Sequence, residues 1–160
     1  MNIQKQLYLG IDVGKTGAMA VFNNTEYYPI EIIRFDHLDC IETELPKIIR
    51  EICFGIENVF VCIEKVGYIV GDGGKGAFTF GTQYGIIKGI IGTLEIPRKE
   101  VLPTKWKRHF GLINSNLSYR DKKKKIKEKV LQHYPELTKY PLSVYDSILI
   151  AEYCKKQFTN

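Results

Sequence analysis

Three carboxylates stand at places in this sequence where an isolated acid is unfavourable. Asp12 and Glu64 each come at the end of an apolar stretch, and Asp146 lies three and four residues before Leu149 and Ile150. Burying one ionised carboxyl without a partner is costly, but several can share divalent cations, which favour carboxylate oxygens and water. Together the acids predict hydrolysis of a phosphodiester by a pair of metal ions, one activating water and the other stabilising the leaving oxygen. The alternative is that each acid accepts backbone hydrogen bonds or pairs with a lysine.

Five segments have the apolar pattern of strands. They predict strands at residues 7–13, 17–22, 25–35, 58–64 and 97–102. Asp12 and Glu64 then lie at the C-terminal ends of two strands. If these two strands are parallel neighbours, their ends converge where α/β sheets usually build sites.

Apolar residues recur at helical spacing in the segments between and after these strands. They predict helices at residues 38–53 (with Pro46 delaying or kinking the regular helix), 77–94, 103–110, 118–133 (opened by a capping box at Ser118) and 142–156. Alternation of these elements predicts an α/β protein whose sheet has strands of mixed direction. With 160 residues the chain has room for a single domain, residues 1–160.

The composition, 44% hydrophobic and 26% charged, is typical of a globular protein. The first residues do not have the pattern of a secretion signal, and no long uncharged stretch appears, so we expect a cytoplasmic protein that is neither secreted nor bound to a membrane. The four cysteines never form a C-x-x-C pair, which favours buried free thiols over a zinc site or disulfides.

Charge is distributed unevenly along the chain. Residues 1–96 carry 8 basic and 12 acidic residues, a net charge of −4, whereas residues 97–160 carry 15 and 6, a net charge of +9. Such asymmetry predicts that one side of the molecule meets a polyanion. The candidate phosphate contacts are Lys105, Lys107, Arg108, Arg120, Lys122, Lys123, Lys124 and Lys125. For the cluster that begins at Arg120, the alternative is a solvated helix face.

Five motifs in order resemble the RuvC-type Holliday junction resolvases of the RNase H-like superfamily, above all the small versions carried by phages and prophages. The motifs are GIDVGKTGAMAVF (10–22), VCIEKV (61–66), FTFGTQYGIIKGIIGTLEIP (78–97), Val101, Pro103, Trp106 and Lys107 in V-x-P-x-x-W-K, and DSILIAEY (146–153). The resemblance spans nearly the whole chain. It implies an RNase H-like fold, a mixed five-stranded sheet flanked by helices.

The resemblance also implies an activity. Proteins of this family are homodimeric, Mg²⁺-dependent endonucleases that resolve four-way DNA junctions by paired nicks. Carried over, Asp12, Glu64 and Asp146 are the acids that hold Mg²⁺ or Mn²⁺, two ions per site. The resemblance also suggests that Lys107 lies near the scissile phosphate, with an ordinary surface lysine as the alternative. The family usually has a further acid three residues before the last one, where this chain has Ser143. A serine hydroxyl can hold a metal-bound water but brings no charge.

Two further features concern DNA and self-association. Tyr68, in the glycine-rich segment after Glu64, is a candidate to stack on an unpaired base, with ordinary packing as the alternative. Glycines recur along one face of the helix at 77–94, at Gly81, Gly85, Gly89 and Gly92. The resemblance suggests a dimer contact through this stripe, and the alternative is close packing against the sheet of the same subunit.

Three other functions remain open. An actin-like or sugar-kinase-like ATPase also begins with D-x-G-x-T, here Asp12, Gly14 and Thr16, but needs a second lobe and a second phosphate loop, so we expect no nucleotide cofactor. A nuclease of the same superfamily acting on a flap or an RNA/DNA hybrid would use the same acids. A noncatalytic DNA-binding module could have lost its second metal through Ser143.

Overall fold

Five strands form one sheet at the centre of the computed structural model, which describes residues 4–65, 67, 73–114 and 116–158. The strands are β1 Gln6–Asp12, β2 Ala18–Asn23, β3 Glu31–Arg34, β4 Asn58–Glu64 and β5 Arg98–Val101. Their order across the sheet is β3-β2-β1-β4-β5. The pairs β1–β2 and β2–β3 are antiparallel, and β1–β4 and β4–β5 are parallel. The predicted α/β sheet of mixed direction is therefore confirmed.

β1 and β4 are the parallel neighbours that the sequence suggested. Ile11 pairs with Ile63, so Asp12 and Glu64 are the next residues along their strands at the same edge of the sheet. The connection between them contains helix α1 (Ile41–Ile52), which crosses one face of the sheet. This register brings the first two acids together.

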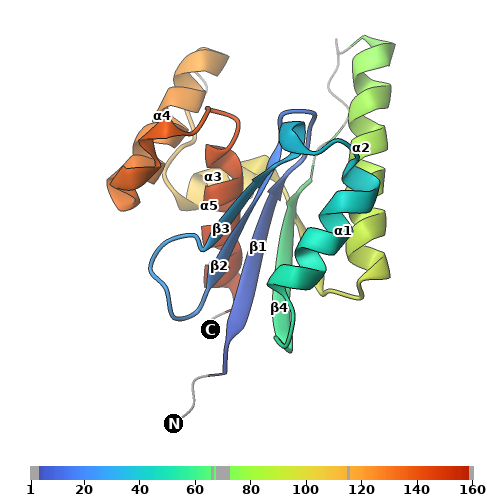
Figure 1. Ribbon diagram of the computed structural model, residues 1–160. Helices are drawn as coiled ribbons and strands as arrows, with labels where there is room; N and C mark the ends of the chain where they lie inside the picture. Colours follow the sequence, from blue (N-terminus) through green and yellow to red (C-terminus); the bar gives the residue numbers. More distant parts are fainter. Residues whose placement is uncertain (1–3, 66, 68–72, 115, 159–160) are drawn as a thin grey trace.

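Helices cover both faces of the sheet, as Figure 1 shows. On one face lie α1 and α2 (Gly74–Thr93); on the other lie α3 (Pro103–His109), α4 (Tyr119–His133) and α5 (Tyr145–Phe158). Two short 3₁₀ helices, η1 (Phe35–His37) and η2 (Pro135–Lys139), complete the described elements. None of the helices in the described part of the chain is long and apolar enough to cross a bilayer.

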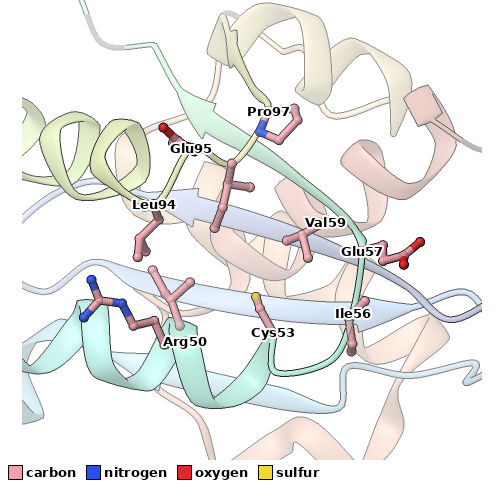
Figure 2. A pocket seen from close by; sticks show the side chains of 10 residues that line it. Arg50, Cys53, Ile56, Glu57, Val59, Leu94, Glu95 and Pro97 are labelled. Atoms are coloured by element: carbon pink, nitrogen blue, oxygen red, sulfur yellow. The ribbon is translucent and has the colours of Figure 1, made fainter.

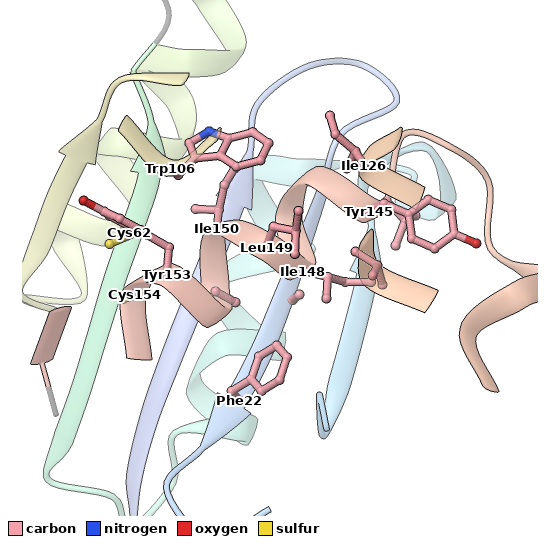
Figure 3. Close-up of a cluster of buried hydrophobic side chains, with 14 of the residues drawn as sticks. Phe22, Cys62, Trp106, Ile126, Tyr145, Ile148, Leu149, Ile150, Tyr153 and Cys154 are labelled. Atoms are coloured by element: carbon pink, nitrogen blue, oxygen red, sulfur yellow. The ribbon is translucent and has the colours of Figure 1, made fainter. Parts of the chain in front are cut away.

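The strand period of two divides the side chains of β1 between two cores. Leu7, Leu9 and Ile11 pack with residues of α1 and α2, whereas Tyr8 belongs to the cluster under α3, α4 and α5. Figure 3 shows this second cluster, in which α5 presents Ile148, Leu149, Ile150 and Tyr153 among other buried residues. All residues of α5 from Tyr145 to Cys154 are buried. The helix that carries Asp146 is thus enclosed by the protein.

Gly10 fixes how closely α5 lies on β1. A Cβ at this position would come within 2.0 Å of the backbone nitrogen of Ala151 and 2.5 Å of the carbonyl oxygen of Ser147. Any larger residue would therefore push the helix away from the strand. Because Asp12 is two residues beyond Gly10 on the same face of β1, this contact also sets the separation between Asp12 and the start of α5.

The third strand and the starts of three helices differ from prediction; α2 begins at Gly74, three residues before the predicted start. β3 covers only Glu31–Arg34, because the side-chain oxygen of Asn23 accepts hydrogen bonds from the N–H groups of Thr25 and Glu26 and turns the chain there. Helix α1 begins at Ile41 and contains Pro46. Helix α5 begins at Tyr145, after a turn at 142–144, so Asp146 lies in its first turn. An acid there is favoured by the helix dipole.

The glycine stripe of α2 faces away from the sheet of its own chain. Gly81, Gly85 and Gly89 are exposed, and no described atom lies within 4 Å of the Cβ that each would carry. Close packing against the same subunit is therefore wrong for these three glycines, whereas a Cβ on Gly92 would lie 3.4 Å from the side chain of Arg98 in β5. The expectation of buried thiols is correct for Cys62 and Cys154, while Cys40 and Cys53 are half-buried; all four are free.

Candidate active site

The three acids line one cavity at the edge of the sheet where β1 and β4 end. The cavity has a volume of about 530 Å³. It is lined by Asp12, Val13, Gly14, Thr16, Gly17, Glu64, Phe80, Pro103, Lys107, Tyr119, Arg120, Lys123, Leu142, Ser143 and Asp146. Two strand ends, the β1–β2 turn and helices α2 to α5 thus contribute to one site. Convergence of the acids agrees with the sequence-based expectation.

Asp12 is the acid most affected by its surroundings. Burial raises the pKa of its carboxyl well above the usual value, and the charges of Asp146 and Glu64 raise this pKa further, while Lys123 lowers it in part. Three carboxylates this close repel one another when all are ionised. A cation among them would remove this repulsion.

Glu64 is oriented by Trp106. The indole Nε1 of Trp106 donates a hydrogen bond of 2.9 Å to Oε1 of Glu64, and Trp106 is completely buried. A buried indole N–H needs an acceptor, and here the carboxylate supplies it. The bond fixes one oxygen of Glu64, which is itself only 8% exposed. Trp106 therefore belongs both to the core and to the site.

Asp146 is paired with a lysine from α4. Nζ of Lys123 lies 2.9 Å from Oδ2 of Asp146, and the side chains are 15% and 3% exposed. Burial disfavours the charge on Lys123, but Asp146 and Asp12 outweigh this effect, so the pKa of Lys123 is raised. The other oxygen, Oδ1 of Asp146, is buried and has no hydrogen-bond partner among the described residues. A buried carboxylate oxygen without a donor is an open position for a cation or a water molecule.

Two further cations line the cavity. Lys107 places its ammonium 4.9 Å from the centre of the Trp106 ring, and Arg120 comes from the first turn of α4. Together with Lys123 they match the three acids in number. The lining is therefore formally neutral, and one divalent cation would make it positive. A positive cavity attracts a phosphate group.

The remaining candidate residues lie around this cavity or outside the described part of the chain. Lys105, Arg108, Lys122, Lys124 and Lys125 are exposed and do not line the cavity. Ser143 lines the cavity from the turn before α5. This is the position at which the resemblance places a further acid. Tyr68 lies outside the described residues, so the structure says nothing of its predicted stacking.

Two contributions of the site were not predicted from sequence: the hydrogen bond of Trp106 and the inward orientation of Lys123. Lys123 lies three residues before Ile126 and seven before Val130, both buried. It therefore shares their helix face, but Lys122, four residues before Ile126, shares it by the same rule. The periodicity sets Lys124 and Lys125 apart, and the structure distinguishes Lys123, which is half-buried, from Lys122, which is exposed.

A second hollow lies at the opposite end of the sheet and has a different character. Figure 2 shows this groove of about 310 Å³, which the C-terminal ends of α1 and α2 form with the start of β4. Its lining includes Cys53, Ile56, Val59 and Leu94. Burial raises the pKa of the Cys53 thiol to about 11, so the thiol stays protonated and unreactive at neutral pH. The groove lacks the converging acids of the cavity at β1 and β4.

The three acids are suitable metal ligands by type, but their side chains are not arranged around a common point for an ion. In the described part of the chain no group of three or more His, Cys, Asp or Glu side chains is arranged to hold a metal ion. Two of the carboxylate oxygens are instead engaged by Trp106 and Lys123. The donor set, the mutual repulsion at Asp12 and the open Oδ1 of Asp146 nevertheless fit a divalent cation.

The sequence matches no protein-family model among those searched, and no curated protein. The structure, however, is similar to solved resolvases. One is Thermus thermophilus RuvC in complex with a Holliday junction substrate (TM-score 0.63, 13% identity, 95% of this chain and 96% of that one). A second structure of T. thermophilus RuvC matches equally well (0.63, 12%, 96% and 97%). The third is the Fowlpox virus resolvase with Holliday junction DNA (0.51, 18%, 96% and 96%).

These likenesses cover almost the full length of each chain, so they concern the whole fold. At 12–18% identity they establish the architecture and leave the chemistry to be argued from the site. The order of strands and the helices on both faces agree with the resemblance found in the motifs. This chain therefore has the RNase H-like α/β fold of the RuvC-type resolvases.

Proposed function

We propose that this protein is a divalent-metal-dependent endonuclease that resolves four-way DNA junctions by paired phosphodiester hydrolysis. The observation that carries the proposal is the convergence of Asp12, Glu64 and Asp146 in one cavity at the ends of β1 and β4. The three structural neighbours described above include two complexes with Holliday junction DNA, which supports branched DNA as the substrate. The basic second half of the chain supplies the charge that such a substrate needs.

Asp12, Glu64 and Asp146 would hold Mg²⁺ or Mn²⁺, as a pair of ions. When bound, such ions supply an activated water and offset the charge that develops on the leaving oxygen. The residues of the chain prepare the site. Trp106 orients Glu64 through its 2.9 Å hydrogen bond, and Lys123 holds Asp146 in place. Ser143 brings a hydroxyl where a fourth acid would bring charge, so we expect one of the two ions to be held more weakly.

Lys107 and Arg120 would bind the phosphate. Lys107 is half-buried against the face of Trp106, which holds its ammonium at the cavity. A fixed cation there stabilises negative charge on the phosphate more than a mobile surface lysine would. The exposed Lys122, Lys124 and Lys125 on α4 and Lys105 and Arg108 on α3 would contact the DNA backbone beyond the cavity, with an affinity that falls steeply with salt.

Paired nicks require two active sites, and we propose a homodimer formed through α2. The exposed Gly81, Gly85 and Gly89 leave room for the backbone of a second helix to approach closely, and Phe78 on the same helix is 78% exposed. A large apolar side chain in water, next to a smooth helix face, favours a protein partner. Sedimentation at several concentrations would measure the dimer directly.

One panel of substrates tests the activity. A four-way junction, a linear duplex, a flap and an RNA/DNA hybrid are incubated with and without Mg²⁺, using the wild type and Asp12→Asn. We expect symmetric, metal-dependent nicks in the junction, and none from Asp12→Asn. Cleavage of the flap or the hybrid alone would mean that the proposed substrate is wrong and that the proposed metal-dependent hydrolysis is right. Junction binding without cleavage by the wild type would identify a noncatalytic module and refute the proposal.

A further inference from the structure

A third hollow, a cleft of about 800 Å³, lies on the helix layer that contains α3, α4 and α5, apart from both the cavity of the acids and the groove of Figure 2. It is lined by Phe22, Tyr27, His109, His133, Tyr134, Glu152, Lys155, Lys156 and Gln157. No residue lines both this cleft and the cavity of the acids. Glu152 and Lys156 follow Asp146 by six and ten residues on α5, which places them about 9 to 15 Å farther along the helix axis.

One side of this cleft is aromatic. The ring centres of Tyr27 and Tyr134 are 6.4 Å apart, and Tyr134 in turn contacts Phe22 at 5.6 Å. Tyr134 and Phe22 are buried, whereas Tyr27, in the connection between β2 and β3, is 78% exposed. Its ring therefore presents a large face to solvent at the entrance of the cleft. Flat π-surfaces of this kind stack on nucleobases.

The other side of the cleft is cationic. Lys155 and Lys156 end helix α5, where they also oppose the negative end of its dipole. Lys155 reaches across to the carbonyl oxygen of Glu26 at 3.2 Å, beside Tyr27 in the sequence. Burial and the nearby Lys156 lower the pKa of His109, so this imidazole is neutral at pH 7 and can serve as a hydrogen-bond donor or acceptor. Positive charge and aromatic surface thus border the same space.

A carboxylate lies between these two sides. Oε2 of Glu152 accepts a hydrogen bond of 3.2 Å from the Tyr134 hydroxyl and faces Nδ1 of His133 at 3.4 Å. Its other oxygen, Oε1, forms an ion pair with Nζ of Lys156 at 3.6 Å, which is longer than a hydrogen bond. Oε1 is therefore positioned to accept a hydrogen bond from a ligand, and the exocyclic amine of cytosine is a donor of the kind that glutamate accepts.

We propose that this cleft binds an unpaired nucleotide of a DNA strand, with the base stacked on Tyr27 and the phosphate on Lys155 and Lys156. Glu152 would favour a base with an exocyclic amine, such as cytosine, over thymine, which has a carbonyl oxygen at the same position. The identification of DNA as the ligand rests on the proposed function; the cleft itself does not involve the acids. Over 9 to 15 Å, one strand of a duplex advances roughly three to four nucleotides, so one DNA molecule can reach both sites.

The test measures binding without cleavage. Fluorescence anisotropy in excess EDTA compares single-stranded oligonucleotides of about 12 nucleotides, one of cytosine and one of thymine, with free dCMP as a competitor. Tyr27→Ala removes the stacking surface, and Lys156→Ala removes a phosphate contact. Their matched controls are Tyr28→Ala, 53% exposed and outside the cleft, and Lys139→Ala, exposed on η2. All four substitutions are at exposed positions, so we expect thermal melting to show that every variant is folded.

We expect Tyr27→Ala to weaken binding of the cytosine oligonucleotide about tenfold, Lys156→Ala to weaken it less, and both controls to leave it unchanged. Tyr27→Trp should restore the affinity, because it restores the stacking surface. Equal affinity of Tyr27→Ala and Tyr28→Ala would overturn the proposal. Displacement of the oligonucleotide by free dCMP would support a site for a single nucleotide, and equal affinity for the cytosine and thymine oligonucleotides would overturn the role given to Glu152. If the wild type cleaves junctions and Tyr27→Ala does not weaken binding, the proposed nucleotide site is refuted, whereas the proposed activity is supported.

Discussion

Replacing Lys123 by methionine tests whether a lysine holds the acids together when no metal is bound. Methionine keeps most of the length and apolar surface of the side chain but removes its charge. The 2.9 Å pair between Lys123 and Asp146 is lost, and Asp146, 2% exposed, is left without its cationic partner next to Asp12 and Glu64. Breaking a buried ion pair by removing one partner leaves an uncompensated charge.

The expected loss of stability follows from the burial of the pair. Breaking buried pairs of this kind costs about 3 to 5 kcal/mol. Because the Lys123 side chain is 15% exposed, we expect the lower end, about 3 kcal/mol. For a chain of this size each kcal/mol lowers the melting temperature by about 2 to 4 °C, so the metal-free variant should melt roughly 6 to 12 °C below the wild type.

Magnesium should reverse most of this loss. A ligand at 100 times its dissociation constant stabilises a folded protein by about 2.7 kcal/mol, close to the expected loss. In the wild type Mg²⁺ must compete with Lys123 for Oδ2 of Asp146, whereas in Lys123→Met that oxygen is available. The stabilisation by Mg²⁺ should therefore be larger in the variant than in the wild type.

The assay is thermal and chemical denaturation of both proteins in EDTA and across a Mg²⁺ titration. Lys124→Met is the matched control: it makes the same change at an exposed position of α4 outside the cavity, and we expect it to behave as the wild type. Lys123→Met combined with Asp146→Asn should recover stability in EDTA, because no charge is then left unpaired. An equal loss of stability for Lys123→Met with and without Mg²⁺, or no loss at all, would refute the reasoning.

Three further changes have distinct expected outcomes. Asp12→Asn should raise the free energy of unfolding in EDTA by about 1 kcal/mol, because it removes one of three repelling charges, and denaturation in urea would show it; a less stable variant would contradict this. Ser143→Asp should lower the Mg²⁺ concentration needed for half-maximal thermal stabilisation about tenfold, since it adds a charged ligand at the cavity, and an unchanged midpoint would mean that residue 143 lies outside the metal shell. Gly85→Ala should stabilise α2 by up to about 1 kcal/mol while weakening self-association in sedimentation experiments; a tighter dimer would exclude close approach of two α2 helices at this position.

The acids could be brought together from sequence because strand geometry constrains them strongly. An apolar strand that ends in a carboxylate has a defined face and a defined end, so the pattern placed Asp12 and Glu64 each at a strand end. Their convergence followed only if the two strands were parallel neighbours, and the structure shows this pairing. The third strand was overestimated because Asn23 turns the chain with its own side chain, a local effect that apolar alternation does not register.

The electrostatic state of the site was harder to predict, because it depends on which lysine turns inward. Four consecutive lysines in the sequence look equivalent as phosphate contacts, and charge counting treats them alike. The structure separates them: Lys123 is half-buried and pairs with Asp146, whereas the other three are exposed. The same pairing offsets the charge of Asp146, which is buried close to Glu64 and to the half-buried Asp12. The sequence offered a choice between acids that share cations and acids that pair with a lysine. The two are not exclusive: Lys123 pairs with Asp146, and we expect a divalent cation to compete with it for the same oxygen.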